Sequence, residues 1–191
     1  MKNLIAGLLL LLGSSVLAGE CSETITVDSV NYPVPAEWCG HRLDSSQIAD
    51  PTKLVRLPAD LSYEDYRIYL LPKARDAFVK MAAAAKEAGV DLIADSGYRS
   101  ARYQRQIIRK RLAAGEKPEK ILSMVAPPGY SQHETGLALD LVPSEARFAK
   151  TGTYSWLKSH ASEFGFFETY PDAPGRKHPW EPWHWAYRLN D

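Results

Sequence analysis

Two short segments far apart in the chain constrain its fold most, because their polar side chains together make up the ligand set of a single metal site. Residues 131–140 read Ser-Gln-His-Glu-Thr-Gly-Leu-Ala-Leu-Asp, and residues 181–184 read Glu-Pro-Trp-His. They supply two imidazoles, His133 and His184, and one carboxylate, Asp140, as candidate ligands. A catalytic zinc site takes three such ligands and leaves one position for water, whereas a structural site usually takes four and favours cysteine. Neither segment contains cysteine, so the pattern predicts a catalytic zinc site.

The pattern around the first two ligands indicates a turn followed by a strand. Leucines alternate with other residues over 137–142, which predicts a strand with Asp140 on the face opposite the leucines. Gly136 permits a tight return of the chain, so His133 on the incoming arm can lie opposite the start of this strand. We therefore expect His133 and Asp140 to point at the same metal ion.

The second segment is predicted to carry His184 on another strand. Residues 183–187 form an aromatic-rich run that is typical of strands. Pro182 disfavours a helical conformation for Glu181, so this is not the helical motif in which a glutamate follows the first of two zinc-binding histidines. Glu181 is then a spare carboxylate close to a ligand, and it is suited to take a proton from an attacking water as the catalytic base.

Each of these residues also has an ordinary structural explanation. A single histidine is more often a polar or core residue than a ligand, and an aspartate after a turn is usually capping or solvated. A Trp-rich strand is more often core, and Glu181 before a proline can be plain loop. The conjunction of three ligands in two compact segments favours the metal site. His178 is a competing ligand, ranked below His184 because it falls in the irregular loop 170–179.

Apolar periodicity and turn residues predict an α+β domain, with an antiparallel sheet that carries the zinc site and helices packed against it. Pro72 starts the first helix and Gly89 ends it, and Ser100 can cap the next one. We expect helices over 72–89, 101–114, 118–124 and 153–164, and strands over 53–57, 90–94, 137–142, 166–167 and 183–187.

Three polar residues are candidates for contacts with the substrate. Arg99 follows Gly97 at a predicted strand-to-helix junction, whereas the basic residues of the following helix face solvent by default. Gln104 lies one turn into that helix and can share the face of Arg99. Ser131 is close enough to a ligand to donate a hydrogen bond to the substrate, although a turn-forming role explains it equally simply.

The first 18 residues have the pattern of a secretory signal peptide. Lys2 precedes an apolar run over 4–12, and small residues lead to a cleavage point after Ala18. The run is too short to span a bilayer comfortably. We therefore expect an exported protein, periplasmic or secreted, whose mature chain has no membrane span.

The mature chain is expected to begin with an irregular arm, residues 19–60, followed by the domain that carries the zinc site, residues 61–191. Cys21 and Cys39 both lie in the arm. In an exported protein a disulfide between them is favoured over two thiols, and such a bridge would stabilise the fold by about 3 kcal/mol.

Charge and length exclude some classes of partner. Lysine plus arginine and aspartate plus glutamate each number 23 in the 191 residues, so nothing in the net charge indicates a nucleic acid partner. The length suits one domain with a substantial core, and we expect a monomer.

The two ligand segments resemble the D-alanyl-D-alanine carboxypeptidase family of zinc metallopeptidases, which includes the vancomycin-resistance carboxypeptidases. The family pattern is Ser-x-His-x-x-Gly-x-Ala-x-Asp followed by Glu-x-x-His, and every fixed position is matched. The resemblance also covers residues 96–100, 156–157 and 164–166. It implies a fold of the hedgehog and D-Ala-D-Ala-peptidase type and a substrate-facing Arg99. It further implies zinc-dependent removal of the terminal D-alanine from peptidoglycan stem peptides.

Two alternatives stay open. Within enzymes, the same fold can serve as an L,D-carboxypeptidase or as an endopeptidase on the same polymer, depending on whether the cleft is closed beyond the scissile bond. In another class, the chain can be a zinc-binding recognition module without turnover, since the hedgehog signalling domain resembles this superfamily. The presence of Glu181 favours catalysis.

Overall fold

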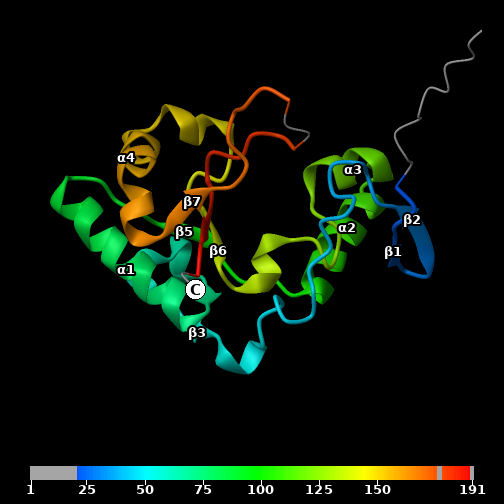
Figure 1. Ribbon diagram of the computed structural model, residues 1–191, viewed down its shortest axis with the longest axis horizontal. Helices are drawn as coiled ribbons and strands as arrows, with labels where there is room; N and C mark the ends of the chain where they lie inside the picture. The colour runs from blue at the N-terminus through cyan, green and yellow to red at the C-terminus, as the bar shows by residue number, and fades with distance from the viewer. Residues whose placement is uncertain (1–20, 176–177, 190–191) are drawn as a thin grey trace, which may run out of the picture.

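A four-stranded antiparallel sheet lies at the centre of the fold, in the strand order β5-β6-β8-β7. The computed structural model, shown in Figure 1, describes residues 21–175 and 178–189. The strands of this sheet are β5 (Ala94–Ser96), β6 (Ala138–Leu141), β7 (Phe166–Glu168) and β8 (His184–Tyr187). Helices pack around the sheet, so the predicted α+β class with an antiparallel sheet is confirmed.

The helices lie on two sides of the molecule. In Figure 1, α1 (Pro72–Glu87) and α4 (Gly152–His160) lie beside the sheet, while α2 (Ala101–Ala113), α3 (Pro118–Met124) and a hairpin of β1 (Thr24–Val27) and β2 (Val30–Pro33) form the other side. A short ladder of β3 (Val55–Arg56) and β4 (Tyr69–Leu70) precedes α1. The 3-10 helices are η1 (Pro51–Lys53), η2 (Ala59–Leu61), η3 (Tyr63–Asp65), η4 (Gln132–Thr135), η5 (Ala146–Lys150) and η6 (Ala161–Phe164).

Each side has its own apolar core. The first core joins α1, α4 and the sheet, and its largest buried members include Phe78, Met81, Leu139, Leu141 and Phe166. The second core joins the N-terminal arm to α2 and α3, and it includes Val27, Trp38, Ile108, Ile121 and Leu122. The predicted leucine face of β6 is thus buried, which leaves Asp140 on the opposite face.

Helix α1 follows directly from its sequence. Pro72 occupies the first turn, where its missing N–H costs nothing. One face is buried through Ala74, Phe78, Met81, Ala82 and Ala85, at the spacing of an amphipathic helix. The predicted start is confirmed, and the helix ends two residues before the predicted Gly89, with Ala88 as its exposed C-cap.

Two elements differ most from their predicted bounds. The strand predicted at 90–94 begins only at Ala94, because Ala94 pairs with Leu141 and Ser96 pairs with Asp140. Which residues belong to β5 is therefore decided by their pairing with β6. The helix predicted over 153–164 is α-helical only to His160 and continues as η6, and Gly165 closes it with φ 79°.

The N-terminal arm is more regular than its sequence predicts. Residues 24–33 form the β1–β2 hairpin, with Ile25 opposite Tyr32. Asp28 and Ser29 at its turn both have positive φ, as a type I′ turn requires. Neither residue is the asparagine or glycine that usually signals such a turn, so the hairpin was not predicted.

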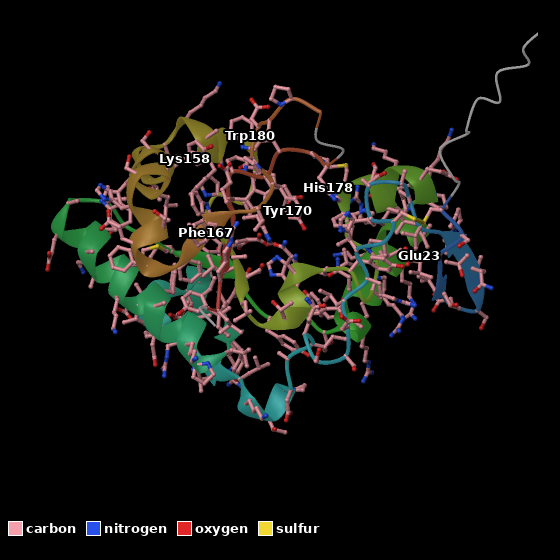
Figure 2. The ribbon with its side chains drawn as sticks, in the orientation of Figure 1. Glu23, Lys158, Phe167, Tyr170, His178 and Trp180 are labelled. Atoms are coloured by element: carbon pink, nitrogen blue, oxygen red, sulfur yellow. A yellow bond between two sulfur atoms is a disulfide. The ribbon has the colours of Figure 1, made fainter. Side chains whose placement is uncertain are left out.

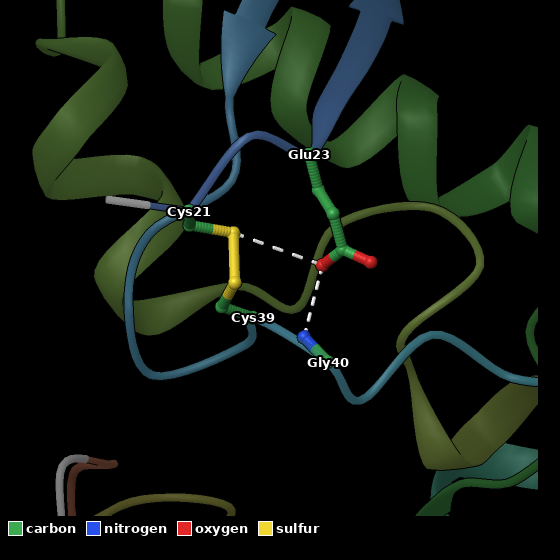
Figure 3. The surroundings of a disulfide bond; sticks show 4 residues. All are labelled: Cys21, Glu23, Cys39 and Gly40. Atoms are coloured by element: carbon green, nitrogen blue, oxygen red, sulfur yellow. Dashed lines mark hydrogen bonds between the residues drawn. A yellow bond between two sulfur atoms is a disulfide. The ribbon is translucent and has the colours of Figure 1, made fainter. Parts of the chain in front are cut away.

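The predicted disulfide between Cys21 and Cys39 is present, with a Cα–Cα distance of 5.8 Å. Figure 3 shows that Glu23 lies beside it, and its carboxylate accepts a hydrogen bond of 3.0 Å from the backbone N–H of Gly40. The predicted signal peptide, residues 1–18, lies outside the described residues. Within the described ranges, no helix combines the length and hydropathy needed to cross a membrane.

Candidate metal centre and active site

The three predicted metal ligands meet in one buried cluster. Candidate ligand atoms of His133, Asp140 and His184 all lie within 4.8 Å of one another. Asp140 and His184 pair directly across β6 and β8, and His133 comes from η4. His133 Nε2 lies 3.3 Å from Asp140 Oδ2, and His184 Nδ1 lies 2.9 Å from Asp140 Oδ1.

Each of the two histidines has an inner ring nitrogen, which faces Asp140, and an outer one, which faces away from it. The outer nitrogen of each ring is hydrogen-bonded to a carbonyl oxygen. His133 Nδ1 lies 2.6 Å from the backbone oxygen of Gly97, and His184 Nε2 lies 3.0 Å from the side-chain oxygen of Gln132. Because a carbonyl oxygen only accepts, each outer nitrogen carries the proton and donates it. The inner nitrogens, His133 Nε2 and His184 Nδ1, are therefore unprotonated and face the carboxylate of Asp140.

This arrangement fits a divalent cation such as zinc. Lone pairs that face a carboxylate at these distances repel it unless a cation lies between them. Atoms bound about 2.0–2.1 Å from a tetrahedral zinc ion lie about 3.3 Å apart, close to the separations seen here. Among the described residues, His133 Nε2 is also buried without a hydrogen-bond partner, because its neighbour is another acceptor.

The electrostatics of the cluster keep the ligands in the forms that bind a metal. Burial and the positive charge of Arg99 lower the pKa of His133 to about 4, so its imidazole is neutral at pH 7. The hydroxyl of Ser96 and the guanidinium of Arg99, which both contact Asp140 Oδ2, favour the ionised form of its carboxyl group. A neutral imidazole and an ionised carboxylate are the ligand forms that a metal requires.

His133 lies within the turn itself, in the 3-10 helix η4, rather than on the arm that leads into the turn. Gly136 ends η4 with φ 67°, a left-handed conformation that glycine adopts without strain. A Cβ at this position would lie 3.0 Å from Leu54 and 3.2 Å from Ala49 and Leu71. Gly136 thus serves both the backbone turn and the close packing that allow His133 to point at Asp140.

Glu181 borders the cavity that contains the three ligands. It lies in a turn, not in a helix, and its carbonyl accepts a 3.0 Å hydrogen bond from the N–H of His184. Burial raises the pKa of Glu181 to about 7; the charge of Asp140 adds to this rise, while His184 and Arg99 oppose it. A carboxyl group with a pKa near neutrality, beside the three candidate metal ligands, is suited to general acid–base chemistry.

Two further side chains contact Asp140. Ser96 donates a 2.7 Å hydrogen bond to Asp140 Oδ2, and the guanidinium of Arg99 lies 3.6 Å from the same oxygen. The backbone N–H of Arg99 donates to the carbonyl of His133 at 3.2 Å, so the chain after β5 is tied to η4. The structure therefore brings Arg99 into the cavity with the candidate ligands.

Gln104 and Ser131 are both buried and line the same cavity. Gln104 donates a 2.8 Å hydrogen bond to the carbonyl of Ala126, and its Oε1 is buried without a hydrogen-bond partner in the described part of the chain. This oxygen can accept a hydrogen bond from a bound molecule. Contacts of either residue with a substrate stay a prediction.

The remaining histidines lie outside the ligand cluster. The ring of His178 packs against that of Trp38 at a centroid distance of 4.0 Å. His160 pairs with Glu163 at 3.1 Å, and His41 is exposed. The placement of His178 agrees with its lower rank as a ligand.

Three residues of the site were not predicted from the sequence. Gln132 directly precedes His133, and a side-chain amide beside a ligand is the one local signal that could have indicated it. Ser96 was expected to follow a strand rather than to lie within it. Trp38 lines the cavity from the N-terminal arm, and no local pattern connects it with the metal ligands.

Comparison with known proteins relates this site to one family. A sequence model described as VanY, D-alanyl-D-alanine carboxypeptidase, matches residues 67–190, which include all three candidate ligands and Glu181. A Bacillus subtilis (strain 168) protein named as a carboxypeptidase, YodJ, is 35% identical over 150 residues, which is 72% of this chain and 54% of YodJ. The chain spans about half the length of the curated relatives it matches.

Solved structures agree with this match. The structure of the LdcB LD-carboxypeptidase is 30% identical with a TM-score of 0.68, over 86% of this chain and 83% of that one. The vancomycin resistance D,D-pentapeptidase VanY, solved in complex with Zn(II), is 28% identical with a TM-score of 0.52, over 69% of this chain and 82% of that one. Sequence, fold and site therefore agree that this chain belongs to the VanY family of D-alanyl-D-alanine carboxypeptidases.

Proposed function

We propose that this chain is a zinc-dependent D,D-carboxypeptidase that removes the terminal D-alanine from peptidoglycan stem peptides. The observation that carries the proposal is the buried cluster of His133, Asp140 and His184 in one cavity with Glu181. The Zn(II) complex of the related D,D-pentapeptidase VanY supports the choice of metal and of reaction.

The residues divide into zinc-holding and proton-transferring groups. His133 Nε2, His184 Nδ1 and the carboxylate of Asp140 would hold the ion. A bound zinc ion would polarise the scissile carbonyl and acidify the attacking water. Glu181 would take the proton from that water and pass it to the departing amine. A pKa of about 7 suits both halves of this transfer, since the group must accept a proton and then release it.

The polar residues around the cluster would hold the substrate. Arg99 would stabilise the carbonyl oxygen as it becomes negative, or pair with a substrate carboxylate, and its Nε is buried without a hydrogen-bond partner in the described ranges. Gln104 Oε1 would accept a hydrogen bond from a substrate N–H. The hydroxyl of Ser131 would donate one to a substrate oxygen.

Each of the three predicted segments of the chain has a role in this function. Residues 1–18 would direct export, residues 19–60 would form the disulfide-closed arm, and residues 61–191 would form the peptidase domain. A bridge between Cys21 and Cys39 supports an oxidising compartment, such as the periplasm or the medium, where the polymer is accessible. We propose that the protein acts there as a monomer.

A second candidate function is L,D-carboxypeptidase activity. The likeness to the LdcB LD-carboxypeptidase, which extends over 86% of this chain, favours it. The two activities differ in the residue before the scissile bond, which has D configuration in the pentapeptide and L configuration in the tetrapeptide. They can therefore be separated by the choice of substrate.

The test is mass spectrometry of stem peptides incubated with the zinc-loaded mature protein and with its Glu181→Gln variant. We expect a pentapeptide ending in D-alanyl-D-alanine to lose one alanine with the intact protein only. Cleavage of the tetrapeptide alone would instead establish the L,D activity. Zinc binding without cleavage of either peptide or of a cross-linked peptide would overturn the enzymatic proposal and favour a recognition module.

A further inference from the structure

Two surface grooves adjoin the cavity that contains the candidate metal ligands, and the N-terminal arm contributes to the wall of this cavity. Asp95 borders both the cavity and two surface grooves, and Arg99 borders one of these grooves as well. On the side of the N-terminal arm, the wall contains Trp38 together with Met124, Val125 and Ala126. A further groove lies behind this wall, and its lining, which includes Glu37 and Leu122, shares no residue with the cavity.

The indole of Trp38 is the partition between these two spaces. Its sequence neighbour Glu37 and its hydrogen-bond partner Leu122 both line the groove behind, whereas Trp38 lines the cavity. The indole N–H donates a 2.7 Å hydrogen bond to the carbonyl of Leu122. Only 6% of Trp38 is exposed, so the ring is fixed in place rather than free to turn into solvent.

Contacts from both sides of the molecule hold this ring. Tyr170, which follows β7, meets the indole edge to face at a centroid distance of 6.3 Å. Figure 2 shows Tyr170 and His178 on the segment that approaches the arm, and His178 packs on the indole. Cys39, the next residue after Trp38, is bridged to Cys21. The wall is therefore anchored to the sheet side as well as to the arm.

The shape of the cavity assigns a direction to the proposed substrate. A stem peptide is linked to a polymer at one end and finishes in a single alanine at the other. The polymer-linked part needs an open path, which the grooves beside Asp95 and Arg99 provide. The terminal residue needs no path beyond itself, so it faces the wall at Trp38.

We propose that Trp38 closes the cavity directly beyond the terminal residue and thereby restricts the protein to removing single residues from a free C-terminus. This inference rests on the proposed function and extends it, because it assigns the choice between carboxypeptidase and endopeptidase to one side chain. A peptide that continued past the terminal alanine would have to occupy the volume of the indole. The matched family domain begins at residue 67, so this specificity comes from a part of the chain outside it.

The experiment compares two peptides: the pentapeptide ending in D-alanyl-D-alanine, and the same peptide extended by one C-terminal glycine. Both are incubated with zinc-loaded wild-type protein and with its Trp38→Ala and Trp38→Leu variants, and products are identified by mass spectrometry. We expect wild-type protein to cleave the bond between the two alanines only in the peptide that ends in D-alanine. Loss of the glycine alone from the extended peptide would still be removal of a single terminal residue, and mass spectrometry separates the two products. Each variant should cleave the extended peptide between the two alanines, raising the ratio of extended to free-ended cleavage by at least about tenfold, the usual scale for one side chain in a pocket.

The controls separate this inference from general damage and from the proposed function. Trp156→Leu replaces a tryptophan of α4 that packs against the other core, and it should leave the ratio unchanged. Trp38→Leu keeps apolar contacts for the arm if Trp38→Ala does not fold. The inference is overturned if folded Trp38 variants cleave the pentapeptide but not the bond between the two alanines of the extended peptide, or if wild-type protein cleaves that bond equally in both peptides. Wild-type protein that cleaves neither peptide would overturn the proposed function first, and this inference with it.

Discussion

As the proposed base, Glu181 should set the pH below which activity is lost. Its pKa is raised to about 7, chiefly by burial, and a carboxylate becomes neutral as the pH falls through its pKa. A bound cation would favour the ionised form and move this pKa downward, so activity should fall off at or below pH 7. We expect kcat/KM for the pentapeptide to drop about tenfold per pH unit on this limb. A Glu181→Gln variant that keeps both the wild-type kcat/KM and this limb would remove Glu181 from the role of base.

Gln132 should contribute to zinc affinity without binding zinc. Its side-chain oxygen accepts the proton of His184 Nε2, which leaves Nδ1 free to bind the metal. Partners of this kind typically change metal affinity 10–100-fold, so Gln132→Ala should weaken zinc binding by roughly that factor. Competition with a chromogenic chelator measures it, and Gln106→Ala, at an exposed position of α2, is the matched control. Equal affinities in the two variants would show that His184 is oriented without Gln132.

The metal ligands could be predicted from the sequence, but the atoms that orient them could not. Two histidines and an aspartate with turn and strand patterns already define a chemistry, and the structure places all three in one cluster. The partner of His133 is the backbone carbonyl of Gly97, which has no residue-type signal at all. Such partners depend on how β5 lies beside η4, and this is decided by tertiary packing.

Gly97, between β5 and α2, should not tolerate a side chain. A Cβ there would lie 2.7 Å from Ile68 Cγ2 and 2.7 Å from the backbone oxygen of Tyr69, and backbone cannot give way as a flexible side chain does. Gly97→Ala should therefore lower the free energy of unfolding by about 1–3 kcal/mol. It should also weaken zinc binding, because the carbonyl that holds His133 must shift.

Thermal unfolding and zinc titration measure both effects of the change at Gly97. Gly152→Ala is the matched control, since Gly152 begins α4, lacks a positive φ, and a Cβ there would meet no atom within 4 Å. We expect this control to behave like wild-type protein. A Gly97→Ala protein that unfolds and binds zinc as the control does would contradict the packing argument.

Helices were predicted better than strands, and the reason is where their signals lie. Pro118 at the start of α3 and Ser100 before α2 are local signals, and both helices begin where these residues predict. Strand β5 contains Asp95 between Ala94 and Ser96, a sequence without alternation, and it exists because β6 offers a partner. Its bounds are therefore a property of the pair and not of its own residues.

The two sides of the molecule contribute differently to the site. The sheet and η4 supply every candidate ligand, whereas α2, α3 and the arm supply walls of the cavity through Gln104, Val125 and Trp38. The sequence predicted the first group, because its members share a chemistry. It predicted Gln104 from its helix face, but it could not connect Trp38 with residues far along the chain.

Because the arm supplies a wall of the cavity but none of the three candidate ligands, the disulfide in the arm should stabilise the fold without changing metal affinity. Bridging Cys21 and Cys39, 18 residues apart, restricts the unfolded chain and is worth about 3 kcal/mol, which for a chain of this size corresponds to a Tm shift of about 6–12 °C. The Cys21→Ser/Cys39→Ser variant should therefore melt lower by about that amount. Its zinc affinity should equal that of wild-type protein, because no ligand comes from the arm. Calorimetry with and without a reductant tests this, since the reductant should lower the Tm of wild-type protein and not that of the variant. If the reductant does not change the Tm of wild-type protein, the arm is held by the packing of Trp38 and its neighbours alone.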